Sequence, residues 1–206
     1  DDAVYVAGMS SLVRLDRANG EIVWRQSTSD HPIAISPGAP TIAGDLVIQT
    51  VASGELMIPR DSYSFRGSMT AFDKATGDQA WQIIFTPGDE TAGAGVGIWS
   101  TPTYDPTSGL VFIGTGNTYE PPAAPLSNSL VAVQAATGEI EWSTQFTYPD
   151  VWSVGHSGGL DADVGAAPNL FSAGGRDLVG VGDKRGDYYA LDRATGEQVW
   201  MTDLTE

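Results

Sequence analysis

The chain has 206 residues, of which 26 are acidic and 10 are Lys or Arg, so its formal net charge is −16 at pH 7. This excess of acid argues against a nucleic-acid partner, because no basic patch offsets the repulsion from phosphates. The sequence has no Cys, which excludes disulfides and thiolate metal sites, and no run of about 18 apolar residues that would span a membrane. It opens on Asp1 and Asp2 without a signal peptide, and we expect a mature or trimmed segment of a periplasmic or secreted protein.

One short pattern occurs four times, at residues 11–24, 67–81, 128–142 and 186–200. Each copy has alternating apolar residues, then Asp (Gln in the third copy), a turn ending in Thr-Gly or Asn-Gly, and an apolar stretch that ends in Trp. The alternation is typical of half-buried strands, the Gly supplies the positive φ of a tight turn, and the Asp can accept hydrogen bonds from the turn backbone. We expect the four terminal Trp side chains to lie in the core. They are Trp24, Trp81, Trp142 and Trp200.

A regular period of about 60 residues, built from strands and turns and without helical periodicity, favours a β-propeller. We therefore predict an all-β chain, with residues 1–206 forming a partial propeller domain of four-stranded blades. The first blade would lack its innermost strand. The predicted blades span residues 3–28, 38–86, 98–147 and 166–204.

Several oxygen-bearing side chains in the connections are not explained by the repeat. Glu55 follows a predicted strand, Asn117 ends another, and Asp161 and Asp163 lie in the segment GLDADVG. Each alone is typical of a polar surface. Together, carboxylate and amide oxygens on consecutive blades suit Ca²⁺, which prefers several oxygen ligands.

Two Trp residues and two cations also lie outside the repeat. Trp99 opens the first strand of the third predicted blade, near the axis where inner strands converge, so its ring can stack on a flat ligand. Trp152 lies in a long loop, and we interpret it as a packing residue. Arg66 and Lys184 precede the second and fourth repeats, where they are either surface charges or partners of an anionic ligand.

The repeats, together with WSTPTYDPTSGLVFIGTGN (99–117) and GDKRGDYYALDRATGE (182–197), resemble the quinoprotein dehydrogenases. The segments that contain Glu55, Arg66 and Asp161 are most similar to the polyvinyl alcohol dehydrogenase branch. The resemblance implies an eight-bladed propeller that holds pyrroloquinoline quinone (PQQ) and Ca²⁺ on its axis. This chain would then form about half of the ring, with the remaining blades supplied by the same or another polypeptide.

The resemblance also assigns roles to individual residues. It implies that Asp161 is the catalytic base, with Asp163 as the alternative, and that Lys184 lies beside the quinone carbonyls. The implied metal ligands are Glu55, Asn117 and Asp161. The implied quinone contacts are Ser53, Gly54, Arg66, Trp99 and Lys184. The chain departs from the family pattern at Ser153, where many relatives have Asp, and in lacking a vicinal Cys pair.

The function implied by the resemblance is oxidation of a primary or secondary alcohol, with polymeric alcohols included. Electrons would pass to an acceptor of the cytochrome c type. The alternative is a non-catalytic propeller of the same repeat, acting as a protein-binding scaffold in outer-membrane barrel assembly.

Overall fold

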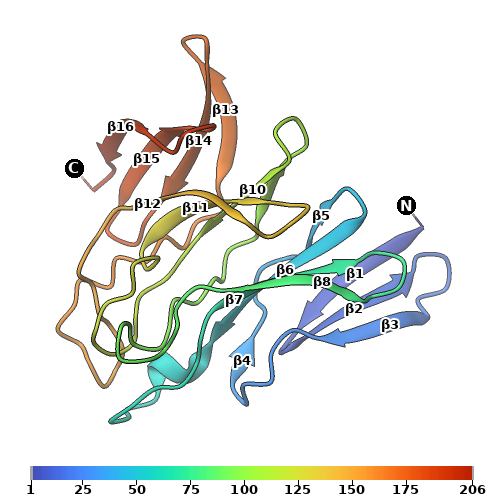
Figure 1. Cartoon of the computed structure of the whole chain (residues 1–206), viewed down its shortest axis with the longest axis horizontal. Helices are drawn as coiled ribbons and strands as arrows, with labels where there is room; N and C mark the ends of the chain where they lie inside the picture. The colour runs from blue at the N-terminus through green and yellow to red at the C-terminus, as the bar shows by residue number, and fades with distance from the viewer. Residues whose placement is uncertain (1, 206) are drawn as a thin grey trace.

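A computed structural model describes residues 2–205 of the chain, and within this range the fold is all-β (Figure 1). The strands form four antiparallel sheets that follow one another in chain order. The described residues contain no α-helix; one 3₁₀ turn, η1 (Gly54–Met57), follows the second sheet's longest strand. No helix among them is long and apolar enough to cross a membrane.

The first sheet has three strands and the second has five. The first consists of β1 (Ala3–Gly8), β2 (Ser11–Asp16) and β3 (Ile22–Ser27). The second consists of β4 (Ala34–Ile35), β5 (Thr41–Ala43), β6 (Leu46–Ser53), β7 (Ser68–Asp73) and β8 (Gln79–Ile84). Both β4 and β5 pair with β6, at opposite ends of that strand. They act as one broken inner strand because Pro37 and Pro40, between them, lack the N–H that a continuous ladder needs.

The third and fourth sheets have four strands each. The third consists of β9 (Thr103–Asp105), β10 (Leu110–Gly114), β11 (Ser129–Gln134) and β12 (Ile140–Gln145). The fourth consists of β13 (Asn169–Ala173), β14 (Arg176–Gly182), β15 (Asp187–Asp192) and β16 (Gln198–Asp203). In each, sequential strands are spatial neighbours, as expected of a propeller blade.

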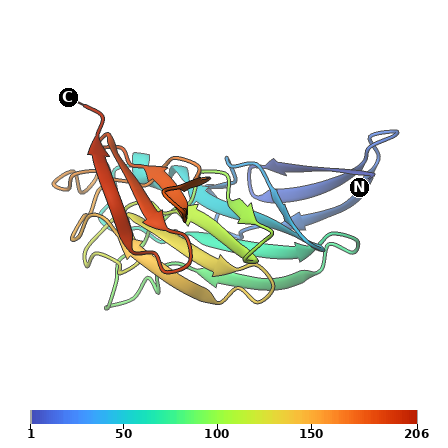
Figure 2. The same ribbon diagram turned by 90° about the horizontal axis from the view of Figure 1, so that it is seen from above.

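The sheets pack face to face in an open arc, with the first and the last at opposite ends (Figures 1 and 2). Alternate side chains of neighbouring sheets form a separate apolar cluster at each junction. The largest joins the second and third sheets through Ile48, Met69, Val111 and Val131, all fully buried. The inner strand β9 lies next to β5 and β13, so the inner strands gather along one side of the arc.

The repeated turns have the chemistry that the sequence predicts. The Asp73 carboxylate accepts hydrogen bonds from the backbone N–H groups of Ala75 and Thr76, both at 2.8 Å. The turn closes through Gly77 at a φ of +79°, and the three other repeat glycines have φ between +73° and +78°. The third copy keeps the turn although Gln134 replaces Asp, because the Gly138 N–H still bonds to the Gln134 carbonyl at 2.9 Å.

Three of the repeat Trp side chains join one sheet to the next. The Trp81 indole N–H donates to the Ala135 carbonyl at 3.0 Å, and its ring lies against Gly138 so closely that a Cβ there would be 2.8 Å away. Trp24 and Trp142 make the same pair of contacts with the second and fourth repeat turns. The prediction that all four Trp are core residues is wrong for Trp200, which is 40% exposed because no further sheet packs on β16.

Candidate active site

Trp99 is placed by a segment that crosses between sheets and not by a strand. The prediction that it opens the first strand of the third blade is wrong, since β9 begins only at Thr103. The backbone just before Trp99 forms hydrogen bonds to the second sheet and to the segment that follows β10. The Ile98 N–H donates to the Val51 carbonyl at 3.1 Å, and the Gly97 carbonyl accepts from the Gly116 N–H at 2.9 Å. These bonds hold Trp99 at the junction of the second and third sheets.

Asn117 and the two candidate aspartates meet at one point. The Asn117 side-chain amide donates to Asp161 Oδ1 at 2.8 Å. Asp163 Oδ1 accepts a short hydrogen bond from the Asn117 backbone N–H. Asn117 Oδ1 is buried and has no hydrogen-bond partner among the described residues, so one oxygen at the centre of the cluster remains available to a ligand.

Lys184 completes this cluster from the turn between β14 and β15. Its Nζ lies 2.6 Å from Asp161 Oδ2 and 2.9 Å from Asp163 Oδ2. The same ammonium lies 5.9 Å from the centre of the Trp99 ring and 5.5 Å from that of Trp152, within cation–π range. Residues from three connections, far apart in sequence, therefore form one charged site beside two indoles.

A hollow of about 340 Å³ lies beside the Trp99 ring. Its lining residues are Trp99, Gly165, Ala166, Gly182, Asp183 and Lys184. Two glycines allow the indole to fit, because a Cβ on Gly116 or Gly165 would lie 2.8 or 2.7 Å from the ring. The result is a flat aromatic wall with an ammonium group at its edge.

The two carboxylates differ in solvent access and in proton affinity. The Asp161 side chain is 26% exposed, whereas that of Asp163 is 2% exposed. Burial raises the pKa of Asp163 to about 7, against the opposing effect of its hydrogen bond from Lys184. Burial alone would lower the pKa of Lys184, but its hydrogen bonds to both carboxylates outweigh that effect and raise it. One ammonium group thus pairs with two carboxylates, of which Asp161 is the more accessible to solvent.

Glu55 is held by the segment that follows it and by His31, whose Nε2 lies 3.6 Å from Glu55 Oε1. The carboxylate is fully buried and accepts from the Phe65 N–H at 2.7 Å, from the Ser64 N–H at 3.1 Å and from Arg60 Nη1 at 3.2 Å. Among the described residues no hydrogen bond or ion pair joins Glu55 to Asn117, and no group of three or more His, Cys, Asp or Glu side chains is placed to hold a metal. The role of Glu55 as a metal ligand stays a prediction.

The other predicted quinone contacts are Ser53 and Gly54, which lie next to Glu55, and Arg66, which lines a different hollow from Trp99. Ser53 begins the η1 turn, where its hydroxyl accepts from the Glu55 N–H and donates to the Ile33 carbonyl, each at 3.0 Å. Gly54 has open space around its Cα. Arg66 donates to the Thr86 carbonyl at 3.1 Å and lines a different hollow, so the structure does not bring it to Lys184.

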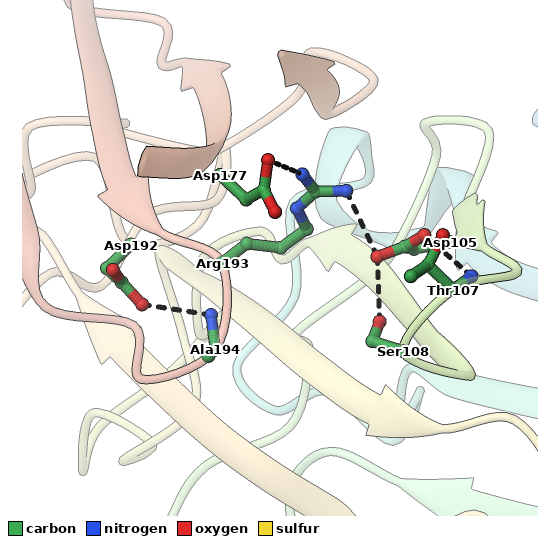
Figure 3. Close-up of a pocket in the computed structure, with 7 residues that line it drawn as sticks. All are labelled: Asp105, Thr107, Ser108, Asp177, Asp192, Arg193 and Ala194. Atoms are coloured by element: carbon green, nitrogen blue, oxygen red, sulfur yellow. Dashed lines mark hydrogen bonds and ion pairs between the residues drawn. The ribbon is translucent and has the colours of Figure 1, made fainter. Parts of the chain in front are cut away.

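Another hollow, of about 380 Å³, contains an ion-pair network that joins two sheets (Figure 3). At its centre Arg193 lies 3.1 Å from buried Asp105 and 3.0 Å from exposed Asp177. The Asp105 carboxylate also accepts from the Thr107 N–H and the Ser108 hydroxyl. Through these two ion pairs Arg193 ties the fourth sheet to the end of β9, while its Nε is buried without a hydrogen-bond partner among the described residues.

The sequence analysis missed Asp150, which is almost fully buried behind the site. Its carboxylate accepts from the backbone N–H groups of Leu160 and Ala162, which flank Asp161. The segment Tyr-Pro-Asp that contains it is typical of an exposed turn, so no local signal marks its burial.

Comparison with known proteins agrees with this fold. The family model described as glucose/ethanol/alcohol dehydrogenase, beta-propeller domain (PQQ) matches residues 29–205. A polyvinylalcohol dehydrogenase from a Pseudomonas species is 31% identical over 93% of this chain and 34% of its own length. The structure of quinohemoprotein alcohol dehydrogenase ADHIIG from Pseudomonas putida HK5 superposes with a TM-score of 0.80 at 26% identity, covering 100% of this chain and 33% of that one. That of the enzyme from Comamonas testosteroni gives 0.77 at 25% identity, covering 98% and 34%.

The chain is a β-propeller segment of the quinoprotein type. It belongs to the PQQ family of glucose/ethanol/alcohol dehydrogenase propeller domains. It spans about a third of the length of the relatives that it matches.

Proposed function

We propose that this chain provides the active site of an alcohol dehydrogenase that uses PQQ and Ca²⁺. The observation that carries the proposal is the cluster in which Lys184 pairs with Asp161 and Asp163 beside Trp99 and Asn117. Relatives named as polyvinylalcohol and quinohemoprotein alcohol dehydrogenases support the same reaction class. The substrate would be a primary or secondary alcohol, with polymeric alcohols included.

The residues present fit such a cofactor. The unpaired Asn117 Oδ1 and the solvent-accessible Asp161 carboxylate are hard oxygen donors of the kind that Ca²⁺ prefers. The Trp99 ring borders a hollow in which a planar molecule can stack on it. Lys184 at the edge of that hollow suits the carbonyl or carboxylate oxygens of an anionic quinone. Glu55 would join the metal site only after exchanging some of its present hydrogen bonds.

When bound, PQQ and Ca²⁺ would supply a polarised two-electron acceptor for the hydride of the alcohol. Asp161 would accept the proton of the substrate hydroxyl, since it is the exposed carboxylate of the pair. Lys184 would hold Asp161 in place and donate hydrogen bonds to oxygens in the hollow. Asp163, nearly inaccessible to solvent, would orient Lys184 and the Asn117 backbone.

We also propose an electron acceptor, a cellular location and a source for the remaining blades. The electrons would leave to a cytochrome c-type acceptor, as the names of the quinohemoprotein relatives suggest. The protein would work in the periplasm or outside the cell. The remaining blades, from the same or another polypeptide, would complete the cofactor's contacts.

The test is to add PQQ and Ca²⁺ to the complete protein and to follow dye reduction with a panel of alcohols. We expect PQQ binding that quenches Trp fluorescence, and dye reduction that depends on both additions. The isolated 206-residue chain should bind PQQ weakly or not at all, because it spans only about a third of the length of its relatives. PQQ binding without dye reduction for any alcohol, or no binding to the complete protein, would contradict the proposal and favour the scaffold alternative.

A further inference from the structure

The backbone of Asp161 has a left-handed conformation, which is energetically unfavourable. Its φ is +54°, in the left-handed region that residues other than Gly, Asn and Asp seldom adopt and that costs up to about 1–2 kcal/mol. In this conformation the two carboxylate oxygens accept hydrogen bonds from Asn117 Nδ2 at 2.8 Å and from Lys184 Nζ at 2.6 Å. Neighbouring structure must therefore stabilise the loop that carries Asp161.

Asp150 makes the bonds that can do this. Its Oδ1 accepts from the Leu160 N–H at 2.7 Å, and its Oδ2 accepts from the Ala162 N–H at 2.8 Å. One carboxylate thus binds the residue before and the residue after Asp161. Because both bonds have a charged acceptor, each is stronger than an ordinary backbone hydrogen bond.

Asp150 is itself held in one orientation. It is 1% exposed, and the Asn128 side-chain amide donates to its Oδ2 at 3.0 Å. The next residue, Val151, pairs with Thr118, which immediately follows Asn117. Gly159 completes the fit, because a Cβ there would lie 2.4 Å from Asp150 Oδ1. A buried carboxylate that is fixed on one side by the connection between β10 and β11 therefore holds the Asp161 loop on the other side.

We propose that Asp150 is the positioning residue of this site: it holds the Asp161 carboxylate where that group meets Asn117 and Lys184. The catalytic consequence rests on the proposed function, but the positioning itself does not. Asp150 touches none of the reacting groups, so it acts through Asp161 alone.

The direct test is the Asp150→Asn variant of the 206-residue chain, because the amide keeps one acceptor oxygen and replaces the other with a donor. The chain has two lysines, so selective labelling gives one NMR signal for Lys184 and an internal reference from Lys74. At a fixed pH of about 7 we expect the Lys184 side-chain signal in D150N to move toward its position in D161N, with the Lys74 signal unchanged. Amide exchange at Leu160 or Ala162 should accelerate about tenfold or more.

Asp105→Asn is the matched control, since Asp105 is a buried aspartate that also accepts a backbone N–H but lies at the Arg193 junction. If D105N moves the Lys184 signal as much as D150N does, the effect is general loosening and the proposal is wrong. If D150N leaves that signal and both amides as in the wild type, the proposal is also wrong.

A second variant covers the case in which D150N does not fold. Asn128→Gly removes the donor to Asp150 while suiting the Asn128 φ of +50°. It should move the Lys184 signal in the same direction by a smaller amount, and an unchanged signal would overturn the proposal.

The catalytic consequence is read separately in the complete protein with PQQ and Ca²⁺. We expect D150N to lower kcat about tenfold or more and to change KM less than twofold. A wild-type protein with no dye reduction, combined with the expected Lys184 shift, would reject the proposed function and retain the positioning role. An unaltered kcat in an active enzyme would reject the positioning role.

Discussion

Asp161 is the carboxylate through which the site would exchange protons with a substrate. It is more exposed than Asp163, and it shares the ammonium of Lys184 with that buried acid. The difference in burial assigns different tasks to two acids that lie two positions apart in the sequence. The exposed carboxylate is the more accessible to a substrate hydroxyl, and the buried one contacts Lys184 and the Asn117 backbone N–H.

The Asp161→Asn variant of the complete protein should lose alcohol oxidation by at least about a hundredfold while still binding PQQ. The amide keeps an oxygen for a cation but does not accept the proton of the alcohol. Dye-linked kinetics and fluorescence titration measure the two properties separately. Retention of most of kcat would transfer the role of base to Asp163 or remove it from both acids.

Gly165 offers a test of the Trp99 wall. A Cβ at this position would lie 2.7 Å from the indole Nε1, so Gly165→Ala must displace the ring. We expect PQQ binding to weaken about tenfold and the near-ultraviolet circular dichroism of the complete protein to change. Gly158→Ala is the control, because nothing lies within 4 Å of a Cβ there. Equal effects of the two variants would show that the Trp99 ring does not contribute to binding.

At the scale of the strand-turn-strand element, one contact recurs at every junction between sheets. Each inward Trp donates its indole N–H to a carbonyl in the next repeat turn and lies against the Gly of that turn. The Gly therefore has two tasks: a positive φ and the absence of a side chain under the ring. These tasks can be separated by experiment.

Gly138→Ala and Gly109→Ala have nearly the same backbone cost, since the two φ values are +78° and +75°. Only the first places a Cβ against a ring, 2.8 Å from Trp81, whereas Gly109 has nothing within 4 Å. We expect G109A to lower the free energy of unfolding by about 1–2 kcal/mol and G138A by about 1–3 kcal/mol more. Urea denaturation measures both. Equal losses would mean that the Trp81 contact adds nothing to stability.

The Arg193 junction predicts a dependence of stability on pH. Burial acts to raise the pKa of Asp105, but hydrogen bonds from Thr107 and Ser108 and the charge of Arg193 outweigh it and lower the pKa. A carboxyl whose folded pKa is lowered stabilises the fold above its unfolded pKa of about 4, and this contribution is lost as the pH falls through the folded value.

Asp105→Asn should therefore cost about 3 kcal/mol at pH 7 and should reduce the loss of stability as the pH falls below about 4. Asp177→Asn, which removes the exposed partner of Arg193, should cost less than about 1 kcal/mol. Thermal unfolding followed across this pH range provides the measurement. If the stability of D105N falls as steeply with decreasing pH as that of the wild type, Asp105 is not the source of this pH dependence.

At the scale of the whole molecule, the arc is open and its two end sheets do not pack on each other (Figure 2). The exposed ring of Trp200 stacks on Tyr188 at 5.9 Å between ring centres, on the outer face of the last sheet. Trp142, in the equivalent position one sheet earlier, is covered by the fourth sheet. Trp24, Trp81 and Trp142 each contact the next sheet, so we predict that a further sheet packs on Trp200 in the complete protein.

In the 206-residue chain, Trp142→Ala should lower the free energy of unfolding by about 3 kcal/mol or more, and Trp200→Ala by about 1 kcal/mol. In the complete protein the cost of W200A should rise to that of W142A, because a further sheet would then cover the ring. Denaturant unfolding of the four variants tests this. A cost of W200A that stays small in the complete protein would mean that no sheet docks on this face.

The sequence by itself determined the blade class and the turns, because their chemistry is local. Asp73, Gly77 and Trp81 act within a few residues of one another or on the next copy of the same pattern, so a regular period is enough to predict them. The resemblance also named Asn117, Asp161 and Lys184, which the structure brings together.

Only the tertiary structure decided which of the named groups meet. Glu55 lies on a neighbouring blade, as expected, yet its carboxylate is satisfied by Ser64 and Phe65. Asp150 has an unremarkable sequence context but is buried behind Asp161. These outcomes depend on how closely loops from different sheets approach one another. The packing of the sheets sets that distance, and the spacing of residues along the chain does not predict it.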